Sequence, residues 1–303
     1  MKVCVPELPE RRELDGLPIE VLPFPEGRPD AGRLADVDVL VVPWWRRDDV
    51  RRLLPRLPRL RLVQAMTAGV EDLIDAVPEG VVLCDAAGVH DVPVAEWTMA
   101  AILAMQKELP AFGEEQRRGR WRPSLADPRD LEGARVLIVG YGSIGRAVEA
   151  RLAPFGADVE RIARRPRDGV HGPEALLALL PSADVVVLLL PLTSATRGTF
   201  DEGVLRAMKN GALLVNAARG GLVDSEALLR ALRAGMLRAA LDTTDPEPLP
   251  EGHPLWSAPG VLVTPHLAGA SPRFHARAFC LVRRQLERLL AGEAPLNIVE
   301  EGY

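Results

Sequence analysis

Arg219, Glu247 and His266 are three ionisable side chains that each stand a few residues after an apolar, strand-like run of this 303-residue chain. Histidine has the side-chain pKa nearest neutrality, which suits it to proton transfer. A carboxylate bonded to its ring would fix the ring and favour its protonated form. The guanidinium can pair with a substrate carboxylate and polarise the adjacent carbonyl. These residue types indicate hydride transfer involving a small 2-keto or 2-hydroxy acid, with His266 as the acid.

A short turn in the first third of the chain offers a second contact for such an acid. Its residues are Thr67, Ala68 and Gly69, which directly follow a predicted strand. Backbone amides of a turn can hydrogen-bond a carboxylate. We therefore expect Ala68 and Gly69 to bind the substrate together with Arg219.

A glycine-rich motif in the middle of the chain is the predicted site of the hydride carrier. It consists of Gly140, Tyr141, Gly142, Ser143, Ile144 and Gly145. A buried-strand run precedes it and a helical run, 144–152, follows it, which is the context that G-x-G-x-x-G needs to bind a dinucleotide. The glycines allow close backbone approach, and the helix N-terminus faces the pyrophosphate. We predict a cofactor site here rather than a merely structural turn.

The residues after the next predicted strand, 158–163, indicate which dinucleotide binds. An NAD site usually ends this strand with an acid about 20 residues beyond the first glycine, to bond the ribose 2′-hydroxyl. Here Arg164 and Arg165 follow the strand, and Glu160 lies inside it. Because the arginines offer positive charge for a 2′-phosphate, the sequence favours NADP(H), with NAD(H) as the alternative. The two arginines would otherwise form only a solvated turn.

Apolar runs alternate with helical stretches, as expected of parallel strands in βα units. In the second half of the chain they lie at residues 135–139, 158–163, 184–190, 212–216, 238–241 and 261–264. Ligands of such sheets bind beyond the carboxyl ends of the strands. The last three strands would therefore bring Arg219, Glu247 and His266 to the edge that carries the glycine motif.

The first third contains a second set of strand-like runs, at residues 3–5, 37–42, 61–65 and 81–83. A long apolar helix, 94–106, joins the two sets, and an amphipathic helix, 271–290, is expected to return to the first. We predict an α/β protein of two doubly wound Rossmann-like domains. Residues 1–98 and 270–303 would form the substrate domain. Residues 99–269 would form the dinucleotide-binding domain, inserted within it.

Composition excludes several other classes. The net charge of −5 and pI near 5.7 provide no overall field for nucleic acid or an anionic membrane. The apolar runs fall far short of the ~20 residues of a spanning helix, and Pro6 interrupts any signal segment. Cys4, Cys84 and Cys280 are odd in number and widely spaced, and the remaining histidines lack ligand spacing. We expect no disulfide framework, no metal site and a cytoplasmic location.

Each tryptophan outside the predicted strands can be interpreted in two ways. Trp44 and Trp45 follow the second strand, where they would either line the substrate pocket or pack in a core or interface. Trp121 lies in an arginine-rich polar stretch, 114–130, whose composition is typical of a linker. A tryptophan in such a loop more often packs against a neighbour.

These motifs resemble those of the D-isomer-specific 2-hydroxyacid dehydrogenases over nearly the full length of the chain. The similar segments are residues 64–70, the glycine motif, and residues 190–196, 216–220, 241–248 and 264–266. The resemblance implies that Arg219, Glu247 and His266 are catalytic and that Asp242 lies near the nicotinamide carboxamide. It also implies cofactor contacts for Pro191, Thr196 and Ala218, and a homodimer.

The missing acid at Ala163 is similar to the pattern of glyoxylate and hydroxypyruvate reductases that use NADP. The resemblance thus favours reduction of glyoxylate, hydroxypyruvate or a related small 2-keto acid. The main alternative is a dinucleotide-sensing binding protein, like the corepressors that share this fold and its triad. An alanine dehydrogenase-like enzyme would leave the order of the three ionisable residues unexplained.

Overall fold

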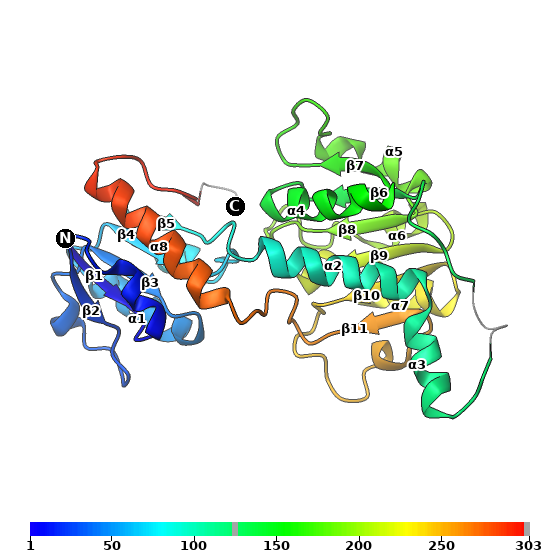
Figure 1. The fold of residues 1–303 in the computed structure, drawn as a ribbon, viewed down its shortest axis with the longest axis horizontal. Helices are drawn as coiled ribbons and strands as arrows, with labels where there is room; N and C mark the ends of the chain where they lie inside the picture. Colours follow the sequence, from blue (N-terminus) through cyan, green and yellow to red (C-terminus); the bar gives the residue numbers. More distant parts are fainter. Residues whose placement is uncertain (123–126, 300–303) are drawn as a thin grey trace. The chain divides into compact units, whose positions relative to one another are not determined.

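The computed structural model describes residues 1–122 and 127–299, which form two compact units (Figure 1). Unit 1 contains Met1–His90 and the chain from Ser271 onward, and unit 2 contains Asp91–Ala270. Each is an α/β unit built on one parallel sheet. The predicted fold class, with one domain inserted in a discontinuous other, is confirmed.

Unit 1 has a five-stranded sheet in the order β2-β1-β3-β4-β5. The strands are β1 (Lys2–Val5), β2 (Glu20–Pro23), β3 (Val39–Val42), β4 (Leu62–Ala65) and β5 (Val82–Cys84). Helix α8 (Phe274–Leu290) covers one face, where Phe279 and Leu286 pack with Val3 and Val5. The opposite face packs against α1 (Arg47–Leu53) and against residues that follow this helix, such as Leu54. The nearly all-apolar strands follow from burial on both faces.

The sequence predicts four strands in unit 1, and β2 is not among them. It has four residues at the edge of the sheet, where its side chains are only partly buried. Pro23 ends it, and a proline has no N–H to donate to a ladder, so it is tolerated only at such an edge. A short, half-exposed strand without an apolar run gives little sequence signal.

Unit 2 has a six-stranded parallel sheet in the order β11-β10-β9-β8-β6-β7. The strands are β6 (Arg135–Val139), β7 (Asp158–Ile162), β8 (Val185–Leu188), β9 (Ala212–Asn216), β10 (Leu237–Leu241) and β11 (Val261–Val263). The order reverses at β6, which pairs with both β7 and β8. The carboxyl ends of β6 and β8 therefore form the switch point at which such sheets bind ligands.

Helices cover both faces of this sheet. They are α2 (Asp91–Gln106), α3 (Leu109–Arg117), α4 (Ser143–Leu152), α5 (Leu176–Leu179), α6 (Glu202–Ala207) and α7 (Ser225–Arg233). On one face Ile102 of α2 and Val148 of α4 share a core with Ile138. On the other face Leu205 of α6 and Leu228 of α7 share a core with neighbouring strand residues. The sheet is thus doubly wound.

Helix α2 lies wholly within unit 2, which begins at Asp91. The predicted boundary at residues 98 and 99 falls inside this helix. Because α2 is continuous and packs on α4, β9 and β10, its first turns belong with the same unit as its last.

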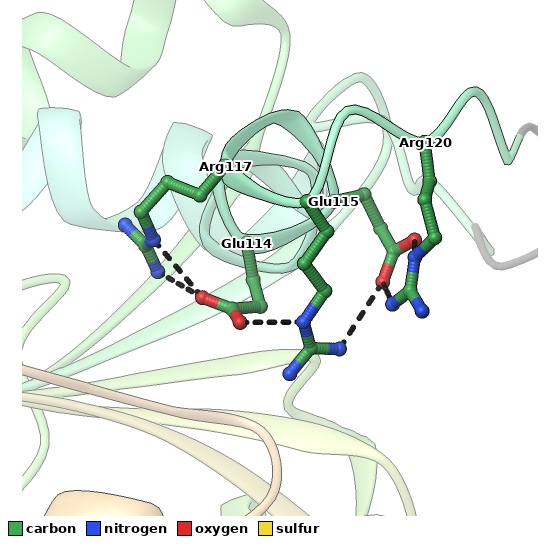
Figure 2. Close-up of polar contacts among 5 residues, drawn as sticks. Glu114, Glu115, Arg117 and Arg120 are labelled. Atoms are coloured by element: carbon green, nitrogen blue, oxygen red, sulfur yellow. Dashed lines mark hydrogen bonds and ion pairs between the residues drawn. The ribbon is translucent and has the colours of Figure 1, made fainter.

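The arginine-rich stretch begins as the end of α3 and then folds back on it. Figure 2 shows Glu114 and Glu115 bound by the arginines that follow them. Glu115 is only 6% exposed, and Arg120 Nε donates to its Oε2 at 2.7 Å. Trp121 beyond this network is 95% exposed, so the interpretation that it packs within the chain is wrong. Residues 123–126 of the stretch lie outside the described residues.

Candidate active site

The glycine motif forms the turn between β6 and α4. Gly140 has φ of 106°, and a Cβ there would lie 2.5–2.7 Å from backbone atoms of Leu189 and Leu190. Only glycine fits, because the segment leaving β8 passes so close. A Cβ on Gly145 would lie 3.2 Å from the carbonyl oxygen of Gly140, so this glycine allows α4 to start close to β6.

Gly142 differs, because an added Cβ would meet no protein atom within 4 Å. It is the N-cap of α4, whose first backbone N–H groups lack partners within the helix. A phosphate approaching this backbone closely would occupy the open position and accept from those groups. The motif therefore fits a dinucleotide pyrophosphate.

Tyr141 is held against the end of β7. Its amide and that of Gly140 both donate to the carbonyl oxygen of Ile162, at 2.8 and 2.9 Å. Its hydroxyl donates to Glu149, which also accepts from Arg161 Nε at 2.9 Å. Arg161 holds the pKa of Glu149 below its usual range. The glycine turn is thus fixed relative to the strand that leads to the predicted ribose site.

Three exposed arginines gather at the turn after β7. Arg164 and Arg165 are those predicted to bind a 2′-phosphate. Sequence reasoning assigned no role to Arg167, yet its Nη2 donates to the Tyr141 carbonyl at 2.9 Å and its Cζ lies 5.6 Å from the Tyr141 ring. The strand acid Glu160 instead contacts the ring of His171, at 3.1 Å.

Pro191 and Thr196 belong to one tight turn after β8, next to the glycine motif. Thr196 Oγ1 donates to the Pro191 carbonyl at 2.6 Å and accepts from the Thr193 amide at 2.8 Å. Since Gly140 touches the segment that enters this turn, the structure brings these two predicted cofactor residues to the switch point.

Arg219 lies in a loop that Asn216 organises at the end of β9. The Asn216 side chain accepts from the Ala218 amide at 3.0 Å and donates to the Arg219 carbonyl at 2.9 Å. A Cβ on Gly220 would lie 2.0 Å from the carbonyl of Thr244, so this glycine lets the loop press on the segment after β10. That segment leads directly to the second predicted catalytic residue.

Glu247 and His266 meet at the carboxyl edge of the sheet. His266 Nδ1 lies 2.5 Å from Glu247 Oε1, and the two side chains are 48% and 39% exposed. Because an ionised carboxylate only accepts, Nδ1 carries the hydrogen of this bond and Nε2 is left for another group. The pair is therefore arranged for proton exchange with a ligand.

Asp242 anchors the loop that carries His266. Its buried carboxylate accepts from the Thr264 hydroxyl at 2.6 Å and from the amides of Leu267 and Ala268 at 2.9 and 2.8 Å. His266 itself has a left-handed backbone, with φ of 52°, which a non-glycine residue adopts only when its surroundings hold it. Sequence reasoning missed this anchoring, and the predicted position near the nicotinamide stays a prediction.

Ala68 and Gly69 lie in unit 1, whereas the other predicted site residues lie in unit 2. They follow β4 in a half-buried turn, in which the Thr67 carbonyl accepts from the Ala86 amide at 3.1 Å. Trp44 and Trp45 follow β3, the neighbour of β4, with their rings edge-on at 5.8 Å. Both tryptophans are about half exposed, so the interpretation as core residues of the chain is wrong.

The three cysteines are free thiols. Cys4 and Cys84 are buried, which raises the pKa of each to about 12, and Cys280 is exposed. Within residues 1–122 and 127–299, no group of His, Cys, Asp and Glu side chains is placed to hold a metal ion. In the same residues, no helix has both the length and the hydropathy needed to cross a membrane.

The fold and these side chains define a class: a two-unit dinucleotide-binding protein with an Arg, a Glu and a His at the carboxyl edge of its nucleotide-binding sheet. Residues 99–268 match the family model of the D-isomer specific 2-hydroxyacid dehydrogenase, NAD binding domain. The chain belongs to the D-isomer-specific 2-hydroxyacid dehydrogenases, a family of NAD(P)-dependent oxidoreductases acting on CH–OH donors. The predicted family and enzyme class are confirmed.

Relatives within the family differ in activity and length. A glyoxylate reductase of Thermofilum pendens is 34% identical over 257 residues, which cover 80% of this chain and 76% of that protein. Matched D-3-phosphoglycerate dehydrogenases are longer, and the alignments span about half of their length, 49–52%.

Solved structures of the family superpose over nearly the whole chain. A D-isomer specific 2-hydroxyacid dehydrogenase from Xanthobacter autotrophicus Py2, in complex with NADPH and MES, is 32% identical with a TM-score of 0.84, covering 99% of this chain and 97% of that one. An NADPH-dependent glyoxylate/hydroxypyruvate reductase from Sinorhizobium meliloti, in complex with NADP and sulfate, is 26% identical with a TM-score of 0.83, covering 99% and 98%.

Proposed function

We propose that this chain is an NADPH-preferring reductase of small 2-keto acids, of the glyoxylate and hydroxypyruvate type. The observation that carries the proposal is the His266–Glu247 pair, held at 2.5 Å on the sheet edge that bears the glycine motif. The Thermofilum pendens and Sinorhizobium meliloti relatives are named for reduction of these acids, which supports the substrate class.

The glycine motif and the turn after β8 would hold the dinucleotide, with Asp242 and Ala218 near its nicotinamide end. The dinucleotide, when bound, would supply the hydride for reduction of the keto acid and accept it in the reverse oxidation. His266 would donate a proton from Nε2 to the keto oxygen, while Glu247 orients the ring through Nδ1.

Arg219 would pair with the substrate carboxylate through its planar guanidinium. Amides of the turn at Ala68 and Gly69 are proposed to bind the substrate, which would make unit 1 the substrate domain and unit 2 the dinucleotide domain. This division follows the predicted roles of residues 1–98 with 270–303 and of residues 99–269.

The preference for NADPH rests on Arg164 and Arg165, which follow β7. A 2′-phosphate would be neutralised by Arg164 and Arg165, whereas no carboxylate stands at the end of β7 for a 2′-hydroxyl. The NADPH and NADP in the two solved relatives support this preference.

We further infer a homodimer in a reducing, cytoplasmic compartment. Helix α2 carries the apolar side chains Trp97, Ala100, Leu103 and Ala104 on a partly exposed face, where a second copy would cover them. The free thiols of Cys4 and Cys84 support the reducing compartment.

The decisive measurement is reduced-nicotinamide absorbance with glyoxylate, hydroxypyruvate, pyruvate and phenylpyruvate, each with NADPH and with NADH. We expect turnover that is fastest with glyoxylate or hydroxypyruvate and NADPH. Dinucleotide binding without turnover of any keto acid would contradict the proposal and favour a dinucleotide-sensing binding protein.

A further inference from the structure

Thr244 lies between the buried end of β10 and the exposed segment that carries Glu247. It is only 9% exposed, whereas Asp245, Pro246 and Glu247 are exposed. Its Oγ1 donates to the Pro246 carbonyl at 2.8 Å. The backbone of Thr244 is itself closely packed, because a Cβ on Gly220 would lie 2.0 Å from its carbonyl. A buried and well-fixed residue thus tethers the exposed segment.

The tether acts on the peptide group that directly precedes Glu247. A peptide group is planar, so holding the Pro246 carbonyl also fixes the plane that ends at the Cα of Glu247. From that Cα the side chain reaches the catalytic ring, with 2.5 Å between Glu247 Oε1 and His266 Nδ1. Because the Glu247 side chain is 39% exposed, packing alone does not hold it, and its place depends on the backbone that carries it.

The exposed segment also borders open space. Asp245 and Pro246 line a surface hollow of about 360 Å³. Ser225, the first residue of α7, lines the same hollow, and its Oγ donates to the Asp245 carbonyl at 2.7 Å. The carbonyls of both residues before Glu247 are therefore held by hydroxyl groups, one of Thr244 and one of Ser225. These two bonds restrain the segment on the side where it borders the hollow.

We propose that Thr244 is a positioning residue for Glu247, acting by holding the Pro246 carbonyl and so placing the carboxylate against the ring of His266. This inference rests on the proposed function, in which His266 donates the proton and Glu247 orients its ring. All of these residues belong to unit 2. Since the hydroxyl of Thr244 carries no net charge, its effect is on the geometry of the pair rather than on the electrostatic field around it.

Thr98 provides a matched control in the same unit. Its side chain is buried in α2, and its Oγ1 donates to the Val94 carbonyl at 2.8 Å. Thr98→Val therefore removes a bond of the same kind and length, but one that leads to no proposed catalytic residue. We expect it to lower stability about as much as Thr244→Val does and to leave the kinetic constants nearly unchanged.

The test measures kcat with glyoxylate and KM for NADPH in each variant and in the unchanged chain. Thr244→Val keeps the shape of the side chain and loses the hydroxyl, so it should lower kcat by about tenfold with KM for NADPH nearly unchanged. Thr244→Ser keeps the hydroxyl and should retain most of the activity. Ser225→Ala should lower kcat in the same direction even if Thr244→Val folds poorly.

A double variant tests whether the effect passes through Glu247. When Glu247→Ala is already present, the carboxylate that Thr244 positions is gone. Adding Thr244→Val to that chain should therefore lower kcat little further, although it lowers kcat strongly in the unchanged chain. A purely structural role would give the same loss in both chains.

Other results would overturn the inference. Unchanged kcat in Thr244→Val, an equal loss in Thr98→Val, or a full further loss on top of Glu247→Ala would show that Thr244 does not act through Glu247. Failure of Thr244→Ser to retain kcat would show that the hydroxyl is not responsible. Lack of turnover by the unchanged chain would overturn the proposed function and this inference together, whereas normal turnover with an unaltered Thr244→Val would overturn only the inference.

Discussion

His266 carries the largest expected effect of any single side chain, because it alone supplies the proton in the proposed reaction. His266→Ala should lower kcat by roughly two or more orders of magnitude and leave the dissociation constant of NADPH nearly unchanged. His171 is the matched control, since it also pairs with a carboxylate in unit 2, at 3.1 Å from Glu160. Wild-type turnover in His266→Ala, measured by NADPH absorbance, would refute the assigned acid.

Arg164 and Arg165 are expected to determine the preference for NADPH over NADH. Replacing both with Ala should raise KM for NADPH by about tenfold or more and hardly change KM for NADH, because only NADPH has a 2′-phosphate for them to neutralise. Initial rates with each cofactor at saturating keto acid measure the ratio. Equal rises for both cofactors would remove the 2′-phosphate assignment.

Asp85 links stability to pH. Burial raises its pKa to about 6, above the ordinary 3.8, while its Oδ1 accepts from the Ala87 amide at 2.8 Å. Because the pKa of Asp85 is raised in the folded state, its stabilising contribution to the free energy of unfolding is fully present below about pH 4. This contribution is lost as the pH rises through 6.

Asp85→Asn keeps the acceptor oxygen and removes the buried charge. We therefore expect it to raise the free energy of unfolding by up to about 3 kcal/mol near pH 8, and by little near pH 4. Urea titrations followed by circular dichroism at both pH values measure the difference. The same gain at both pH values would show that the charge is not responsible.

At the scale of elements, the loops after β9 and β10 depend on a close backbone contact. Gly220→Ala would place a Cβ 2.0 Å from the Thr244 carbonyl and push the Arg219 loop away from the segment that carries Glu247. We expect kcat to fall by at least about tenfold with NADPH binding retained.

Gly221→Ala is the control for this effect. Its nearest neighbours are side-chain atoms of Arg197 and Leu192, which are able to move aside, so the loss in kcat should be much smaller. Equal losses in the two variants would indicate that any bulk in this loop is harmful and that the Gly220–Thr244 contact has no special role.

The features that the sequence predicts depend on residues close together in the chain, whereas the features that it does not predict depend on residues far apart in the chain. The strand, turn and helix around Gly140 follow from residues next to one another, and so do the strand ends that deliver Arg219 and His266 to one edge. Asp242 holds amides at Leu267 and Ala268, and Arg167 holds the Tyr141 carbonyl. These contacts form between residues that are far apart in sequence and that only folding brings together, so no local sequence pattern predicts them.

For the whole molecule, the proposed homodimer depends on the apolar outer face of α2. Changing Ala100 and Leu103 to Glu would place charges in a desolvated interface and should convert a dimer to a monomer. Light scattering coupled to size-exclusion chromatography measures the mass directly. A monomeric mass for the unchanged chain would refute the dimer, and a dimeric mass for the double variant would place the interface elsewhere.

The interrupted course of unit 1 also has a consequence for synthesis on the ribosome. Unit 2 is one continuous stretch, Asp91–Ala270, and it is translated before α8, whose Phe279 and Leu286 cover the β1–β5 sheet. The apolar face around Val3 and Val5 is therefore made first and covered last. We expect unit 2 to complete its folding before unit 1, although the first strands of unit 1 are translated earlier. Until α8 covers the apolar face of unit 1, we expect the nascent chain to depend on chaperones.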